Sequence, residues 1–365
     1  MTTYDSNDAA DTTDVITVRG ERDLIALIPY QLGFRPEDSA VLLTEVSDAD
    51  RRYLGLTVRM DLADLDDPAR CAGLTPTVAT QITRQGTEGL ILVLFVEEQY
   101  EDARIDPGLY HSVATLDEAM PTDVPAIAEE DVWVVGDDGW GHLVACECCP
   151  RYGHCLEELD YSPAAAGMVV TGHVVASSRE DLAVTRSASD VARQQANRAA
   201  QAEAVRRSCS SPEPWRTKMA HLWDGAVKGG ADPELLGRLL AALADRQLRD
   251  AVVAAAMESA EGCTASYLDA DVVAGAFDVG MPPDPEVADR AMTLAQQVAA
   301  HAPTDQAGPA LGLLAYLAWW SNHGARADVV ARQALAEEPG HRLAALVIDA
   351  IEHAVPPSWV RLRAT

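Results

Sequence analysis

The feature that most constrains the fold is a continuous apolar run, Leu90 to Val96, which lies between Gly89 and Glu97. A short apolar run without polar alternation, bounded by such residues, is typical of a central strand that is buried on both faces. A strand of this kind requires other secondary-structure elements to cover its sheet. The run therefore predicts a layered α/β domain in the first half of the chain.

Strand and helix signals alternate around this run from Val15 to about His173. The other predicted strands cover residues 40–46, 53–61, 132–136 with 140–145, and 168–176. The predicted helices cover residues 23–32, 68–85 and 108–120. Residues 137–141 supply the turn of a hairpin between two antiparallel edge strands. We therefore expect a two-layer or three-layer α/β domain with a mixed sheet over residues 15–180.

The rest of the chain predicts a tail, a connector and a helical domain. Residues 1–14 are polar and acidic and predict a disordered tail. Residues 181–213 are polar and rich in alanine and arginine, which predicts a solvent-exposed connecting helix or linker. Residues 214–365 carry only helical signals, such as the N-cap, N1 proline and acidic first turn of Asp232-Pro233-Glu234. We expect an all-α domain there that ends in an α-hairpin.

Net charge and cysteine content limit the partners and the compartment. The formal net charge is -29, and residues 1–180 carry 34 acidic and 11 basic side chains. Such a field repels phosphate backbones and anionic lipids, so we expect neither a nucleic-acid nor a membrane partner and favour a protein partner. The start has no signal-peptide pattern, and seven mostly clustered cysteines fit a reducing compartment. These features predict a cytoplasmic protein.

Four cysteines lie within ten residues: Cys146, Cys148, Cys149 and Cys155. Crowded thiols in a reducing compartment typically bind metal, and four thiolates satisfy tetrahedral zinc. Zinc knuckles separate paired cysteines by two to four residues, whereas Cys148 and Cys149 are adjacent, which makes convergence of their sulfurs awkward. The simpler interpretation is therefore a tight turn of buried structural thiols, and a redox or nucleophilic thiol is a further alternative. His142 and His154 lie nearby.

Arg59 and Asp61 form the other candidate site. They are two residues apart at the C-terminal end of a predicted strand, so both project to one face. The C-terminal ends of strands are where ligands gather in open α/β sheets, so this pair could grip a polar substrate. The simpler interpretation is a salt bridge that anchors the strand end. The chain lacks the P-loop, Rossmann, nucleophile-elbow and zincin motifs, and therefore the parts on which those enzyme classes depend. Five scattered histidines are expected at the surface or at helix ends: His111, His221, His301, His323 and His341.

Residues 20–43 predict a helix with a C-terminal cap at Gly33, followed by a polar turn and a strand. This block, RGxxDLIAxIPYxLGFRPEDS with its following strand, and a Cys-Cys-Pro turn at Cys149-Pro150 resemble an actinobacterial family known only as a domain of unknown function. In that pattern Trp140, one cysteine and Gly153 also have counterparts, whereas Cys155 has none. The stretch around Trp319 to Pro339 is weakly similar to a tetratricopeptide helix pair.

The resemblance implies no activity, so three functional hypotheses remain. The first is a non-enzymatic protein-interaction or scaffold module, which the missing catalytic motifs and the terminal helix pair favour. The second is an enzyme of unrecognised class with a site near Arg59, Asp61 and the Cys146 to Cys149 turn. The third is a small metal-binding module that holds zinc through the cysteine cluster.

Overall fold

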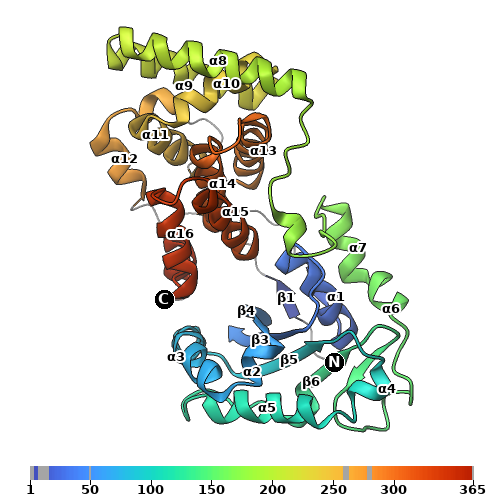
Figure 1. Cartoon of the computed structure of the whole chain (residues 1–365). Helices are drawn as coiled ribbons and strands as arrows, with labels where there is room; N and C mark the ends of the chain where they lie inside the picture. The colour runs from blue at the N-terminus through green and yellow to red at the C-terminus, as the bar shows by residue number, and fades with distance from the viewer. Residues whose placement is uncertain (1–3, 7–15, 49–50, 258–262, 278–281, 364–365) are drawn as a thin grey trace. The chain divides into compact units, whose positions relative to one another are not determined.

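The computed structural model describes residues 4–6, 16–48, 51–257, 263–277 and 282–363. The chain divides into an N-terminal unit, Met1–Ser178, and a helical unit, Arg179–Thr365. The N-terminal unit contains a mixed β-sheet with helices, and every element described in the second unit is helical (Figure 1). The predicted fold class, an α/β region with a mixed sheet followed by a helical region, is confirmed.

The described strands form one sheet in the order β2-β1-β4-β3-β5-β6-β7. β5 pairs antiparallel with β3 and parallel with β6, which makes the sheet mixed. β6 and β7 form the antiparallel edge hairpin that the turn residues predict. The strands are β1 (Tyr4–Ser6), β2 (Ile16–Val18), β3 (Ser39–Asp48), β4 (Arg51–Asp61), β5 (Gly89–Phe95), β6 (Val132–Val135) and β7 (Trp140–His142).

β5 is the central strand that the apolar run predicts. Its even-numbered residues pack with α3 (Pro68–Arg84) and α5 (Pro107–Ala119). Its odd-numbered residues pack with α1 (Glu21–Leu32) on the opposite face. Figure 1 shows α3 and α5 on one side of the sheet and α1 on the other. The N-terminal unit therefore has three layers, because both faces of β5 must be removed from water.

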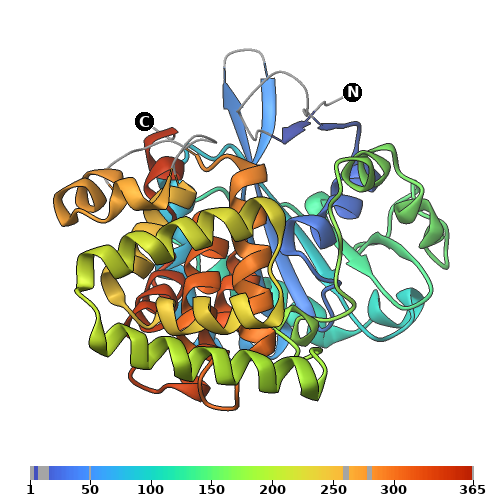
Figure 2. The same cartoon turned by 90° about the horizontal axis from the view of Figure 1, so that it is seen from above.

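The segment 20–43 folds as its signals predict. α1 ends at Gly33, which adopts a left-handed conformation at φ 81° and donates its N–H to the carbonyl of Pro29 at 2.8 Å. β3 then begins at Ser39 and runs antiparallel to β4 and β5. Past Glu45, β3 pairs with β4 and no longer with β5, so that the two strands project as a hairpin (Figure 2).

The predicted strand over residues 168–176 is wrong. That region begins instead with α7 (Pro163–Val170), whose N-cap Ser162 accepts the N–H of Ala165 at 3.0 Å. The Ser-Pro start signal and the small residues after it outweigh the β-branched valines, which are exposed. The other short helices of this unit are α2 (Leu62–Leu65), η1 (Glu129–Asp131), α4 (Tyr100–Ala103) and α6 (Glu157–Asp160).

The predicted tail over residues 1–14 is described only in part. Tyr4–Ser6 form β1, which pairs with β2 and β4. Residues 1–3 and 7–15 lie outside the described part of the chain.

The helical unit is built around α14 (Gly308–Trp320), in which ten of thirteen residues are buried. It packs with the helices that precede and follow it along the chain. No described helix has the length and apolar character needed to cross a membrane. The other helices are η2 (Glu180–Leu182), α8 (Asp190–Cys209), α9 (Pro212–Gly229), α10 (Pro233–Leu243), α11 (Arg246–Met257), η3 (Thr264–Tyr267), α12 (Ala270–Phe277), α13 (Pro285–His301), α15 (Gly324–Glu337), α16 (Arg342–Glu352) and α17 (Ser358–Arg363).

α8 occupies most of the segment in which we expected an exposed connector. It packs along α10 within the helical unit (Figure 2). Ala196, Ala199 and Ala200 on one face of α8 are buried. Glu203 on the same helix is also buried and accepts hydrogen bonds from Trp215, Arg206 and Arg238. Most of the buried residues of α8 are alanines, and most of the rest of the helix is polar. The sequence therefore shows no large apolar face that would predict this contact.

Candidate metal centre

The cysteine cluster belongs to a loop that leaves the edge hairpin and returns to it. β7 ends at His142, the chain passes through Cys146 to Cys149, and His154 then pairs with Trp140 on the free edge of β7. The backbone N–H of Trp140 donates to the carbonyl of His154 at 3.0 Å, and the N–H of His154 donates to the carbonyl of Trp140 at 2.7 Å. Both ends of the loop are therefore fixed to the sheet.

Tyr100 packs against both ends of this loop. Its side chain is buried, and its hydroxyl donates to the carbonyl of His142 at 2.9 Å. A Cβ at Gly141 would lie 2.5 Å from that hydroxyl. Gly153 has φ 76°, and a Cβ there would lie 2.8 Å from the Tyr100 ring. Glycine is required at both positions because Tyr100 fills the space that a side chain needs.

Four potential metal ligands converge at the start of the loop. One ligand atom from each of His142, Cys146, Cys148 and Cys149 lies within 4.8 Å of the others. The sulfurs of Cys148 and Cys149 are 3.9 Å apart. Tetrahedral zinc with Zn–S bonds of about 2.3 Å holds two sulfurs about 3.8 Å apart. The separation of the adjacent cysteines therefore suits one zinc ion, although their spacing in the sequence suggests otherwise.

Cys155, a member of the predicted four-cysteine set, is not in this group. Its side chain is exposed, and His142 from β7 takes the fourth place. The ring of His142 packs against Trp133 with a centroid distance of 3.6 Å and an angle of 32° between the ring planes. The signal for His142 in the sequence is its position at the end of the edge strand, four residues before Cys146.

Burial and mutual hydrogen bonding set the protonation of these ligands. Burial lowers the pKa of His142, which favours the neutral imidazole that metals bind. Burial raises the pKa of Cys149 to about 12. Burial also acts to raise the pKa of Cys146, but hydrogen bonds from Cys148 and Cys149 outweigh it and lower this pKa. A bound metal must displace the thiol protons, so affinity for metal rises with pH.

A cavity of about 370 Å³ lies beside the cluster. His142, Cys148 and Cys149 line it, together with Trp133 and Trp140. The charged residues that line it are Glu21, Arg22 and Glu158. The indole N–H of Trp140 is buried and has no hydrogen-bond partner in the described part of the chain. The group of potential metal ligands and the cavity thus share three side chains.

Arg59 and Asp61 form a salt bridge at 2.6 Å, and Arg59 also donates to the buried hydroxyl of Ser39 at 2.8 Å. One row of paired residues crosses the sheet from β4 to β7: Arg59, Val41, Val93, Trp133 and His142. Four strand spacings separate the ends of this row, or about 19 Å. The structure therefore does not bring Arg59 and Asp61 to the cysteine turn, and neither residue lines the cavity.

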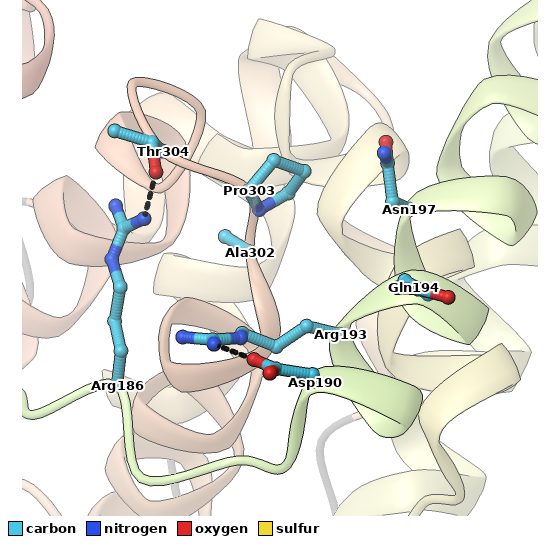
Figure 3. A pocket seen from close by; sticks show the side chains of 8 residues that line it. All are labelled: Arg186, Asp190, Arg193, Gln194, Asn197, Ala302, Pro303 and Thr304. Carbon is cyan, nitrogen blue, oxygen red and sulfur yellow. Dashed lines mark hydrogen bonds and ion pairs between the residues drawn. The ribbon is translucent and has the colours of Figure 1, made fainter.

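A second cavity, of about 350 Å³, lies in the helical unit (Figure 3). Arg186 and Arg193 line it, and Figure 3 shows the first donating to Thr304 and the second pairing with Asp190. Arg186 also pairs with Glu337. Because both guanidinium groups already have acidic partners, this cavity has no uncompensated positive charge with which to attract an anion.

Comparisons with known proteins place the chain in a family but assign no activity. A family model described as Domain of unknown function (DUF4192) matches residues 22–358, which is more than half of the chain. No curated protein and no solved structure matches the chain.

Proposed function

Since the chain belongs to the family described as Domain of unknown function (DUF4192), whose description names no activity, we propose a function from its own side chains: the N-terminal unit is a zinc-binding module. His142, Cys146, Cys148 and Cys149 are the proposed ligands. The convergence of these four donors within 4.8 Å carries the proposal. Thiolate and imidazole ligands select zinc over magnesium or calcium, which prefer oxygen.

The proposed zinc has a structural role. A site with four protein ligands is closed and leaves no position for a substrate. Three of its ligands come from residues 146–149 and the fourth from β7, so the ion ties the loop to the sheet edge. Because His142, Cys148 and Cys149 also line the adjacent cavity, the ion holds one wall of that cavity in place.

Elemental mass spectrometry of untagged protein tests this proposal. We expect the double variant Cys146→Ser/Cys148→Ser to bind one equivalent of zinc less than the natural chain. The variant should also melt at a lower temperature, because metal-binding free energy contributes to folding. The matched control Cys155→Ser changes a cysteine of the same loop that lies outside the ligand group and should retain the zinc. Unchanged zinc content in the double variant would contradict the proposal.

A protein-interaction role is a second proposal, and one observation favours it. Large apolar side chains are exposed over a short segment that begins just before α7 and ends just after it: Tyr161, Val169, Val170 and Val174. Val170 and Val174 have 86% and 85% of their surface exposed. Clustered exposed apolar residues are typical of protein-contact sites.

Quantitative affinity capture tests the protein-interaction role. We expect the variant Val170→Asp/Val174→Asp to lose a partner that the natural chain retains. Val205→Asp serves as the control, because Val205 is also exposed but lies on α8. If all three proteins capture the same set at the same levels, this segment is not a contact site.

A further inference from the structure

A second group of metal-ligating side chains lies in the helical unit. His221 and Asp224 are three residues apart on α9, so their side chains share one face of that helix. Cys263 immediately precedes η3 and approaches both of them from another part of the chain. One ligand atom from each residue lies within 4.8 Å of the other two.

The distances in this group suit a tetrahedral ion. The sulfur of Cys263 donates to Oδ2 of Asp224 at 3.1 Å and lies 4.0 Å from Nδ1 of His221. With Zn–S near 2.3 Å and Zn–N or Zn–O near 2.0 Å, a tetrahedral zinc separates sulfur from a nitrogen or oxygen ligand by about 3.5 Å. The two observed distances lie on either side of this value, so small side-chain rotations accommodate the ion.

The carboxylate of Asp224 is held in position by Thr264. The backbone N–H of Thr264 donates to both carboxylate oxygens, at 3.2 and 3.1 Å, and its hydroxyl donates to Oδ1 at 2.5 Å. Thr264 is 1% exposed. Hydrogen bonds of this kind orient the ligands of metal sites.

The arrangement does not suit a cysteine nucleophile. Such a nucleophile needs an imidazole base within hydrogen-bond reach of the sulfur, with the carboxylate behind the imidazole. Here the carboxylate of Asp224 faces the sulfur of Cys263, and His221 is the more distant group. An ionised thiol and a carboxylate at this separation repel each other unless a cation lies between them.

We propose that His221, Asp224 and Cys263 form a zinc site with three protein ligands and a fourth position open to water. On binding, the zinc–sulfur bond replaces the S–H bond of Cys263, and the thiol proton passes to solvent. Asp224 Oδ2, which accepts that proton's hydrogen bond, becomes an oxygen ligand. The ligand set is mixed and incomplete, which is typical of zinc sites that act on a bound water or exogenous group.

Cobalt titration of a chain without the first site tests this proposal. In the full-length Cys146→Ser/Cys148→Ser variant we expect one Co²⁺ per chain and a thiolate-to-cobalt charge-transfer band. Adding Cys263→Ser should abolish the band, and adding His221→Ala should weaken binding at least about tenfold. Adding Cys209→Ser, which changes an exposed cysteine of the same unit, should leave the band unchanged.

A folded variant, checked by far-ultraviolet circular dichroism, that shows no band overturns the proposal, as does a band that survives Cys263→Ser. If the background variant does not fold, the test moves to the otherwise natural chain, in which Cys263→Ser should remove one equivalent of bound cobalt and Cys209→Ser none. The two sites are distinguishable because each is deleted by its own cysteine substitutions.

Discussion

His341 caps a helix and is also buried. It is the N-cap of α16, where its Nδ1 accepts the N–H of Ala344 at 3.3 Å. It is also only 4% exposed, and its ring occupies the space where a side chain at Gly312 would lie. Its Nε2 is buried and has no partner in the described part of the chain. The sequence predicts a helix end here, but burial decides the chemistry of the ring.

The burial of His341 makes stability depend on pH. Burial lowers its pKa below the ordinary value of 6.5, while nearby Glu338 acts to raise this pKa and Arg249 to lower it. The unfolded chain therefore takes up a proton before the folded chain does, and stability falls as pH drops below 6.5. We expect urea unfolding between pH 7 and pH 5 to show this decline.

His341→Asn is the matched variant, because asparagine also caps helices but does not titrate in this range. Its free energy of unfolding should change less between pH 7 and pH 5 than that of the natural chain. Parallel pH profiles for the two proteins would show that His341 is not the titrating group.

At the scale of elements, the contact between α8 and α10 depends on close backbone approach. A Cβ at Gly237 on α10 would overlap the backbone of Ala196 on α8. The buried residues of α8 are mostly alanines, so the two helices meet through small side chains. The same composition makes α8 look solvent-exposed when its sequence is considered alone.

Two glycine-to-alanine changes separate helix propensity from packing. Gly237→Ala should destabilise the protein by about 1–3 kcal/mol, because the added methyl group forces α8 away from α10. Gly225→Ala on α9, where nothing lies within 4 Å of the added atom, should stabilise it by about 0.5–1 kcal/mol. Urea unfolding measures both. Equal effects of the two changes would mean that the α8–α10 contact tolerates separation.

At the scale of the whole molecule, each unit has its own hydrophobic core. The two core clusters around the sheet contain residues of the N-terminal unit alone. The three remaining clusters contain residues of the helical unit alone. The negative charge also differs between the two parts of the chain: the net charge is -23 over residues 1–180 and -6 over residues 181–365. Each proposed metal site likewise draws all of its ligands from one unit.

The sequence alone determined the features that depend on near neighbours. The stop of α1 at Gly33, the two buried faces of β5, the β6–β7 hairpin and the cap of α10 at Asp232 all follow from patterns shorter than a dozen residues. Caps, turns and periodicity act within a few residues, so a local pattern is sufficient to predict them. α7 is the exception, because two local signals competed there.

Only the tertiary structure decided which potential metal ligands converge. His142 takes the place expected for Cys155, because β7 ends beside the cysteine turn while Cys155 follows the return of the loop to β7 and lies outside the group. Cys263 meets His221 and Asp224 across about 40 residues of chain, a separation that no local spacing rule covers. Ligand convergence depends on the path of the folded backbone, and long-range packing sets that path.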